Sequence, residues 1–279
     1  MRIGLVVNSR IETAVGESLN IIEFLKDKVE LFITNELEQL VGGTYKEKPY
    51  SVAPLTDFAK HQIELLITIG GDGTILRALH NCNIKIFGIN AGVVGFLTEI
   101  NLKEAMESLI KILNNEYILD ERVRIMTMLN NKTLEPATNE AVIHTSDIAK
   151  MRLYQIKLDG VIVQNIHADG IIISTPTGST SYAMSAGGPI IDPKVDAFLI
   201  VPIAPYKLSA RPLVVPSSSI ITIKIMESHR NSVLVIDGQE EYEVTSNDEL
   251  SFAKDETPAR FIRFEPNFYK SIEEKLTTQ

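Results

Sequence analysis

The feature of this chain that most limits its fold is a strand-like run that ends in glycines and continues as an amphipathic helix. Residues 63–69 form a mainly apolar run that is typical of a buried strand. The sequence Gly70-Gly71-Asp72-Gly73-Thr74 follows, and then Ile75, Leu76 and Leu79 share one helical face. A strand joined to a helix by a glycine-rich turn indicates an α/β protein.

The glycine turn also suggests a chemistry. Glycines let the backbone approach a ligand closely, with N–H groups free to meet phosphate oxygens. A carboxylate in such a turn repels phosphate, so Asp72 needs another task, such as taking a proton from a hydroxyl group or holding Mg²⁺. The turn therefore suggests phosphoryl transfer, although an ordinary surface turn of an α/β protein remains an alternative.

The first hundred residues alternate between strand-like and helix-like patterns. Apolar runs at 3–7, 29–34 and 84–89 are typical of strands, and residues 18–28 place apolar side chains on one helical face. This alternation predicts a Rossmann-like parallel sheet covered on both faces, with ligands bound beyond the carboxyl ends of the strands. We therefore assign residues 1–100 to an α/β phosphate-binding domain.

The pattern changes after residue 100. Residues 101–254 contain short strand-like runs separated by turn signals, and Asp159-Gly160 between two such runs is a strong hairpin signal. We expect this second domain to be mostly antiparallel β. The C-terminal tail, residues 255–279, has a helical pattern over 267–276 and is expected to pack back on the first domain.

Charge and composition exclude several classes of protein. The chain has 279 residues and a net charge of −9, whereas nucleic-acid and membrane-surface binders need a positive footprint. Cys82 is the only cysteine, so an intrachain disulfide is impossible. The five histidines form no pattern typical of a zinc site, and we predict no protein-held metal. No apolar run is long enough to span a membrane, and the start resembles a first strand rather than a signal peptide, so we expect a cytoplasmic protein.

A second glycine cluster follows the next strand, over residues 88–97. Two such clusters after neighbouring strands of one sheet are expected to open at the same edge and to form a groove lined by amides. The residues expected to form this phosphate loop are Gly70, Gly71, Gly73, Thr74, Asn90, Gly92 and Gly95.

Three later segments are unusual for their setting. Asn139-Glu140 precedes an apolar run and offers an amide beside a carboxylate, which suits ribose hydroxyls or a base edge but also fits an ordinary strand edge. Every residue of 174–182 except Pro176 and Gly178 carries a hydroxyl group. Residues 237–239, Asp-Gly-Gln, end a strand and by themselves indicate only a turn.

Taken together, these segments resemble the NAD kinase family. The resemblance rests on GGDGT at 70–74, GINAGVVGFL at 88–97, NEAVI at 139–143, ADGIIISTPTGSTSYAMSAGGP at 168–189, PIAPYKLSARPLVVP at 202–216 and DGQ at 237–239. GGDGT alone is shared with diacylglycerol and sphingosine-type lipid kinases, whereas STPTGSTSY with the Asn-Glu pair is more specific to NAD kinases.

The resemblance implies a reaction and a set of site residues. Family members transfer the γ-phosphoryl group of ATP to the 2′-hydroxyl of the adenosine ribose of NAD, giving NADP. Asp72 matches the proposed general base of the family. The positions that match NAD-binding residues are Asp72, Gly73, Arg77, Asn139, Glu140, Lys150, His167, Asp169, Thr180, Ser181, Tyr182, Ala183, Met184, Ser185, Ala204 and Gln239.

The resemblance also implies a cofactor and partners. Mg²⁺ or another divalent cation is expected to arrive with ATP, polyphosphate is an alternative donor, and a homodimer or homotetramer is expected through the β domain. The chain departs from the family pattern at Thr138, Ser181 and Ala204-Pro205-Tyr206, and the charge at position 167 varies in the family. A lipid kinase and a non-catalytic dinucleotide sensor are the competing interpretations.

Overall fold

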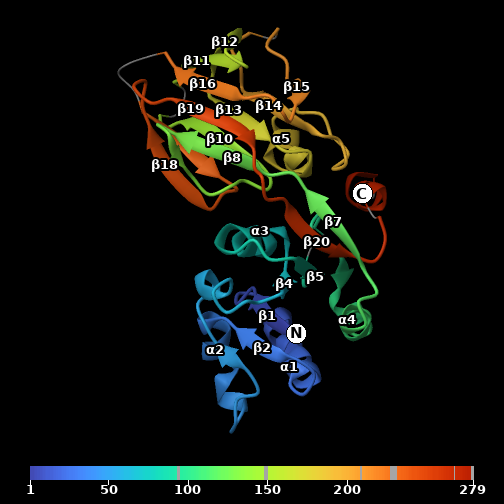
Figure 1. The fold of residues 1–279 in the computed structure, drawn as a ribbon. Coiled ribbons are helices and arrows are strands. Elements are labelled where there is room, and N and C mark those ends of the chain that lie inside the picture. Colours follow the sequence, from blue (N-terminus) through green and yellow to red (C-terminus); the bar gives the residue numbers. More distant parts are fainter. Residues whose placement is uncertain (93–94, 148–149, 208, 227–230, 267, 278–279) are drawn as a thin grey trace. The chain divides into compact units, whose positions relative to one another are not determined.

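The computed structural model describes residues 1–279 except 93–94, 148–149, 208, 227–230, 267 and 278–279 (Figure 1). The described chain divides into two compact units. The first unit contains Met1–Glu121 and Ala259–Gln279, and the second contains Arg122–Pro258. None of the helices formed by the described residues has the length and hydropathy needed to cross a membrane.

The first unit is built on a sheet with strand order β3-β2-β1-β4-β5-β20-β7, with β6 paired to β5. Its strands are β1 (Arg2–Val7), β2 (Glu30–Ile33), β3 (Ser51–Val52), β4 (Leu65–Gly70), β5 (Ile86–Asn90), β6 (Ile100–Asn101), β7 (Ile118–Arg122) and β20 (Ala259–Arg263). Neighbouring strands from β3 to β20 run parallel, as do β5 and β6. The prediction of a parallel sheet in the N-terminal part is confirmed.

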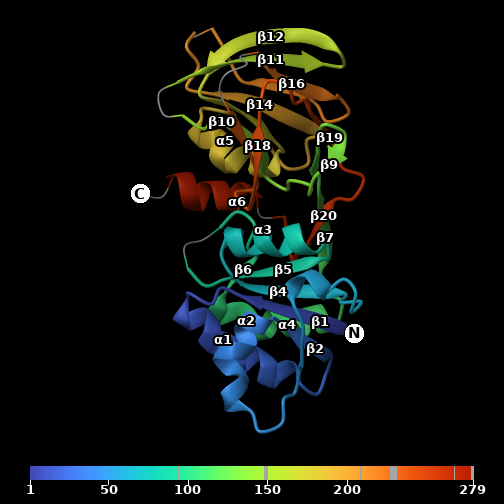
Figure 2. The same ribbon diagram turned by 90° about the vertical axis from the view of Figure 1, so that its left-hand side faces the viewer.

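Helices cover both faces of this sheet (Figure 2). The helices are α1 (Glu12–Leu25), α2 (Asn35–Val41), α3 (Asp72–Asn81), α4 (Ala105–Leu113) and α6 (Phe268–Ile272), and a π-helical turn over Glu273–Thr277 follows α6. Helices α1, α2 and α4 pack with Leu5 of β1 in one apolar cluster, whereas α3 packs with Val6 in another. Adjacent residues of a strand point to opposite faces, which explains why almost every residue of β1 is apolar.

The second unit contains two antiparallel sheets, with strand orders β15-β14-β13-β10-β17-β18 and β12-β11-β16-β19-β8-β9. Their strands are β8 (Ile125–Leu129), β9 (Lys132–Thr133), β10 (Glu140–Thr145), β11 (Arg152–Leu158), β12 (Val161–Ala168), β13 (Gly170–Ser174), β14 (Ala197–Ile203), β15 (Leu213–Pro216), β16 (Ile221–Ile225), β17 (Ser232–Ile236), β18 (Glu240–Val244) and β19 (Leu250–Lys254). Apolar residues of both sheets form one shared core. The short helix α5 (Tyr182–Ser185) contributes Ala183 to a smaller cluster with Val142 and Ile172.

The local turn signals correspond to real turns. Asp159 and Gly160 join β11 to β12 with φ angles of 49° and 83°, and β11 and β12 pair antiparallel. Left-handed backbone at both positions matches the right-handed twist of the two strands. The predicted antiparallel character of the C-terminal part is confirmed.

The division of the chain differs from the boundaries expected at residues 100/101 and 254/255. The first unit extends to Glu121 because Ala105, Leu109 and Ile112, on one face of α4, are buried in the apolar cluster of β1 and α1. The chain returns to this unit at Ala259, where β20 pairs parallel to β5. The tail then forms α6; Asn267, where the sequence predicted the start of this helix, lies outside the described residues.

A buried ion pair links β20 to residues 98–99, which follow β5. The Arg263 guanidinium donates to the Glu99 carboxylate at 2.9 Å and to the Thr98 carbonyl at 3.2 Å, and the side chains of Arg263 and Glu99 are only 2% and 3% exposed. The second Glu99 oxygen accepts the Phe264 N–H at 2.8 Å. Removal of one charge of such a pair leaves the other buried and uncompensated.

We therefore predict that Arg263→Met lowers the free energy of unfolding by about 3–5 kcal/mol. The matched control is Arg260→Met on the same strand, because its ion pair with Glu121 is about half exposed and is expected to contribute less than about 1 kcal/mol. Urea denaturation at pH 7 measures both. Equal losses for the two variants would contradict the assigned role of the buried pair.

Candidate functional site

The glycine turn of the first unit forms the start of α3. Strand β4 ends at Gly70, Gly71 is the N-cap residue, and α3 begins at Asp72. Gly73 and Thr74 therefore lie in the first helical turn, where the Thr74 N–H donates to the Gly71 carbonyl at 3.0 Å. The N–H groups that precede it have no acceptor within the helix. The positive end of the helix dipole and these N–H groups together favour an anion at this position.

The Asp72 carboxylate connects the two glycine clusters. Its oxygens accept the main-chain N–H groups of Phe96 at 2.7 Å and Leu97 at 3.0 Å. An added Cβ at Gly95 would collide with this carboxylate. Asp72 thus has a structural partner that the sequence did not indicate, and Gly95 is required by the position of Asp72.

The other glycines of the turn differ in the space around them. Gly71 has φ −120° and ψ −170°, a backbone conformation open to any residue, and an added Cβ at Gly71 or Gly73 would meet no atom within 4 Å. Gly70, in contrast, packs against the Thr74 side chain. Backbone strain therefore does not explain Gly71 or Gly73, and close approach of a ligand remains the reason to expect glycine there.

The remaining predicted residues of this unit lie near the same turn. Arg77 is four residues after Gly73 on α3, on the same helical face, and is partly exposed. Asn90 ends β5 and accepts the Gly92 N–H through Oδ1 at 2.8 Å, while its buried Nδ2 has no partner among the described residues. Residues 93 and 94 of the second glycine cluster lie outside the described chain.

The C-terminal tail adds a cation that sequence reasoning missed. Lys275 Nζ lies 3.5 Å from the centroid of the Phe96 ring, next to the residue whose N–H binds Asp72. Partial burial lowers the pKa of Lys275 to about 8, and the charges of Asp72 and Glu274 oppose this shift. No local pattern in the sequence could connect residue 275 with residue 72, because only the fold of the tail brings them near each other.

In the second unit, the main chain before β10 is held by Asp237. One carboxylate oxygen accepts the Thr138 N–H at 2.6 Å, and the other accepts the N–H groups of Asn139 at 2.8 Å and Glu140 at 3.0 Å. Asp237 follows β17 in a left-handed conformation (φ 48°) and is buried. The sequence assigned no role to Asp237, and the only signal was its place in the DGQ segment.

The carbonyl groups of the same turn are held by the hydroxyl-rich segment. Thr175 donates from Oγ1 to the Thr138 carbonyl at 2.6 Å and from its N–H to the Asn139 carbonyl at 2.9 Å. Ser174 Oγ lies 3.3 Å from the Asn139 carbonyl, and Gly178 packs so closely against this carbonyl that a Cβ does not fit. The turn at 138–140 is thus fixed from both sides.

The side chains of Asn139 and Glu140 keep free acceptor oxygens. Ser181 Oγ donates to Glu140 Oε1 at 3.0 Å, whereas the buried atoms Asn139 Oδ1 and Glu140 Oε2 have no partner among the described residues. Burial, and secondly the charge of Asp237, raise the pKa of Glu140 to about 7; the Ser181 hydroxyl and the Tyr182 amide act in the opposite direction. A buried acceptor without a partner is costly, so a ligand with hydroxyl or amino groups fits here.

The predicted ligand loop at 180–185 has mixed roles. Thr180 Oγ1 donates to the Thr177 carbonyl at 3.2 Å, and the side chain of Ala183 is fully buried in an apolar cluster. Ser181 reaches Glu140, and Tyr182, Met184 and Ser185 are exposed or partly exposed. Ser181 and its exposed neighbours are therefore better placed for a ligand than Thr180 or Ala183. Gln239 is also exposed, just after Asp237.

Lys150, His167, Asp169 and Ala204 lie at the other end of β10. The Thr145 N–H, at the end of β10, donates to the Asp169 carbonyl at 2.8 Å. The Asp169 N–H donates to the carbonyl of Ile203, the residue before Ala204. The His167 carbonyl accepts the Tyr206 N–H. Glu140 and Thr145 are five residues apart, which is about 17 Å along a strand. Within this chain, these four residues therefore do not lie in one site with Asn139 and Glu140.

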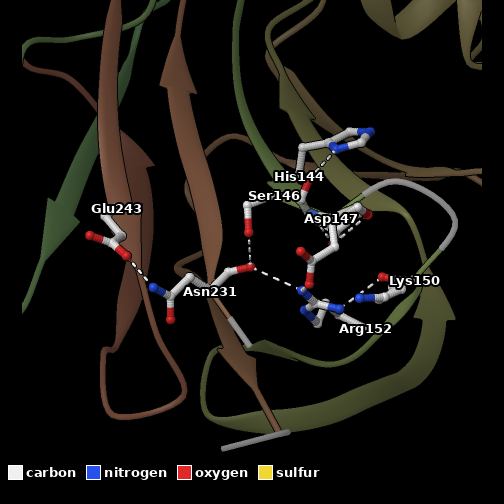
Figure 3. Close-up of polar contacts among 8 residues, drawn as sticks. His144, Ser146, Asp147, Lys150, Arg152, Asn231 and Glu243 are labelled. Atoms are coloured by element: carbon white, nitrogen blue, oxygen red, sulfur yellow. Dashed lines mark hydrogen bonds and ion pairs between the residues drawn. The ribbon is translucent and has the colours of Figure 1, made fainter. Parts of the chain in front are cut away.

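Lys150 belongs to a segment anchored by a buried arginine (Figure 3). Arg152 donates to the Lys150 carbonyl at 2.8 Å, to Asp147 Oδ2 at 3.1 Å and to the Asn231 carbonyl at 3.1 Å. The Lys150 side chain itself is exposed. Among the described residues, no group of three or more His, Cys, Asp or Glu side chains is arranged to hold a metal ion.

Comparison with known protein families gives two matches. The model described as the ATP-NAD kinase N-terminal domain matches residues 3–117, and the ATP-NAD kinase C-terminal domain matches residues 138–264. A protein named NAD kinase from Methanothermobacter thermautotrophicus is 42% identical, over 99% of this chain and 96% of that protein. A protein named NAD kinase from Thermoplasma volcanium is 37% identical, over 99% of this chain and 98% of that protein.

Solved structures give the same result. The chain is similar to yeast NADH kinase in complex with NADH, with a TM-score of 0.91 and 25% identity over all of this chain and 88% of that one. It is also similar to an NAD kinase from Archaeoglobus fulgidus in complex with ATP, with a TM-score of 0.82 and 29% identity over the full length of both chains. The two family models together cover most of the chain, and the relatives are more than 30% identical over nearly its full length, so the chain belongs to the ATP-NAD kinase family.

Proposed function

We propose that this protein is an NAD kinase, which transfers the γ-phosphoryl group of ATP to the 2′-hydroxyl of the adenosine ribose of NAD and so produces NADP. The observation that carries the proposal is the turn at 138–140, where Asn139 Oδ1 and Glu140 Oε2 are buried without a partner among the described residues. Such acceptors suit the hydroxyl and amino groups of a nucleoside.

The competing interpretations are less well supported. A lipid kinase shares the glycine turn, but it needs an apolar substrate site and has no use for two buried, unpartnered polar acceptors. A non-catalytic sensor accounts for the structural contacts of Asp72, but the relatives of this chain are named as kinases rather than as sensors. Family membership supports the enzyme, because the relatives and structural neighbours are named as NAD or NADH kinases.

In the proposed mechanism, Asp72 acts on the acceptor hydroxyl. The 2′-oxygen forms a bond to the γ-phosphorus, the bond from that phosphorus to the β–γ bridging oxygen breaks, and the hydroxyl proton passes to the Asp72 carboxylate. The positive end of the helix dipole at the start of α3 stabilises charge on the transferring group. Alignment and neutralisation of charge supply most of the acceleration in such reactions.

The expected divalent cation is proposed to be bound by the phosphates of ATP. Among the described residues, no group of three or more acidic, histidine or cysteine side chains is arranged to hold a metal ion, so these residues offer no complete set of ligands. Mg²⁺ would neutralise charge on the phosphates.

Product formation tests the proposal directly. The purified protein is incubated with NAD or NADH and either Mg·ATP or polyphosphate, and a lipid alcohol replaces the dinucleotide in a parallel reaction. We expect NADP from NAD with Mg·ATP. Phosphorylation of the lipid alcohol but not of the dinucleotides would overturn the proposal, and so would dinucleotide binding without turnover.

We further propose a cytoplasmic homodimer or homotetramer. The outer strand β12 carries three adjacent exposed apolar residues, Val161, Ile162 and Val163, with exposed fractions of 66%, 51% and 39%. Exposed apolar side chains on an edge strand favour association with another chain. Light scattering coupled to size-exclusion chromatography measures the subunit number.

The first prediction for this function concerns Glu140. Glu140→Ala removes a buried acceptor worth about 1–3 kcal/mol, so the KM for NAD is expected to rise roughly tenfold or more, and the KM for ATP much less. Glu241→Ala, an exposed glutamate of β18 in the same unit, is the matched control. Equal effects of Glu140→Ala on both substrates, in a folded protein, would count against the assignment.

The second prediction concerns Asp72. Asp72→Asn is expected to lower kcat by roughly 10²-fold or more, the scale of a lost general base, with little change in the Kd for NAD. Because Asp72 also binds the N–H groups of Phe96 and Leu97, the midpoint of thermal unfolding is measured in parallel. Gly95→Ala, which displaces the carboxylate without changing its chemistry, shows the effect of misplacement alone. A near-normal kcat with greatly weakened NAD binding would refute the proposed role.

The third prediction concerns Gly71. Gly71→Val is expected to abolish activity through a clash with the bound phosphates, while the thermal midpoint changes little, because the free protein has space for the side chain. Gly43→Val is the control, since a Cβ at Gly43 also meets no atom within 4 Å and Gly43 lies outside the site. Wild-type turnover by Gly71→Val would show that this turn does not bind phosphate.

A further inference from the structure

Asp237 is a buried carboxylate that the proposed reaction does not use. Burial raises its pKa, and the N–H groups of residues 138–140 and the positive charge of Arg124 act in the opposite direction. All three N–H groups belong to consecutive residues, and two of these residues carry the unpartnered acceptor oxygens. Burial of a charged carboxylate costs free energy unless hydrogen bonds replace those to water. The burial of Asp237 beneath three N–H groups therefore calls for an explanation.

We propose that Asp237 is a positioning residue for the dinucleotide. It fixes the main chain at 138–140 and thereby directs the side chains of Asn139 and Glu140 toward the ligand, without contacting the ligand itself. The inference rests on the proposed function, since it assumes that Asn139 and Glu140 bind NAD.

The geometry explains why a carboxylate is required. Oδ2 accepts one N–H and Oδ1 accepts two, so both oxygens of Asp237 act as acceptors. An asparagine would place a donor NH₂ group against at least one N–H group of the turn. The carbonyl groups of the turn are already bound by Ser174 and Thr175, so the peptide planes cannot rotate to accept this donor without loss of other bonds.

The charge of Asp237 has a second consequence for Glu140. The pKa of Glu140 is about 7, raised by burial first and by Asp237 second. Glu140 is therefore ionised above about pH 7 and protonated below it. An ionised carboxylate accepts hydrogen bonds from ligand hydroxyls at both oxygens, so the KM for NAD is expected to fall as the pH rises through about 7. Loss of the Asp237 charge lowers the pKa of Glu140 and moves this transition to lower pH.

Other groups near Glu140 and Asp237 also affect the pKa values of these two carboxylates. The Ser181 hydroxyl and the Tyr182 amide face Glu140. Burial raises the pKa of Asp237, and the positive charge of Arg124 opposes this shift. Burial lowers the pKa of Arg124, and the charges of Asp255 and Glu135 oppose that shift. These groups are unchanged in the variants below, so a shift of the transition reports on the charge of Asp237.

The experiment compares Asp237→Asn with wild type in steady-state kinetics with NAD and Mg·ATP between pH 6 and 8.5. Loss of one or more charge-assisted hydrogen bonds is expected to raise the KM for NAD roughly tenfold or more, with the KM for ATP within about twofold of wild type. The pH transition of the KM for NAD should move to lower pH, and Glu140→Gln should abolish it. A merely structural role for Asp237 would lower the midpoint of thermal unfolding but leave the KM for NAD of the folded variant unchanged.

Asp248→Asn is the matched control. Asp248 also accepts a main-chain N–H, that of Thr245 at 2.7 Å, but it lies between β18 and β19, outside the site. This variant is expected to keep the wild-type KM and pH transition. A change in both variants alike would overturn the specific role of Asp237.

Two further outcomes are distinguished. Absence of NADP formation by the wild type would overturn the proposed function, whereas an active wild type with unchanged KM and pH transition in Asp237→Asn would overturn only the positioning role. Thermal unfolding and circular dichroism report whether Asp237→Asn folds. If it does not, Thr175→Val, which removes the hydroxyl bond to the Thr138 carbonyl, decides: an unchanged KM for NAD would show that the turn does not position the ligand residues.

Discussion

Main-chain N–H groups in loops and at the start of strands need acceptors, and in this protein two aspartates supply them. Asp72 binds the N–H groups of residues 96 and 97, and Asp237 binds those of residues 138–140. A buried donor without an acceptor costs about 1–3 kcal/mol, so each carboxylate determines the conformation of a loop that is distant in sequence. The second glycine cluster and the Asn139-Glu140 turn both depend on this interaction.

The hydroxyl-rich segment combines a structural and a functional role. Thr175 binds the main chain of the Asn139 turn, and Ser179 bonds the Pro176 carbonyl and the Ile191 N–H, so both hydroxyls satisfy buried backbone groups. Ser181 instead reaches the Glu140 carboxylate. This segment thus both builds the turn and shapes the polar site beside it.

Local features could be predicted because their cause is local. The alternation of strands and helices, the hairpin at Asp159-Gly160 and the strand–glycine–helix unit at 65–81 depend on side-chain periodicity and on the allowed backbone angles of a few adjacent residues. The end of the first unit was not predictable in this way. Helix α4 is amphipathic wherever it packs, and only its contacts with β1 and α1 assign it to the first unit.

The sequence by itself determined the fold class, the family and the residue types available for phosphoryl transfer, because periodicity, glycine placement and motif order are properties of the linear chain. Only the tertiary structure decided which of these residues act together. It placed Asp237 under the Asn139 turn and Lys275 beside Phe96, and it left Asp169 at the far end of β10 from Glu140. These relations join residues that are distant along the chain, and they follow from strand pairing and the burial of polar groups, which no local pattern encodes.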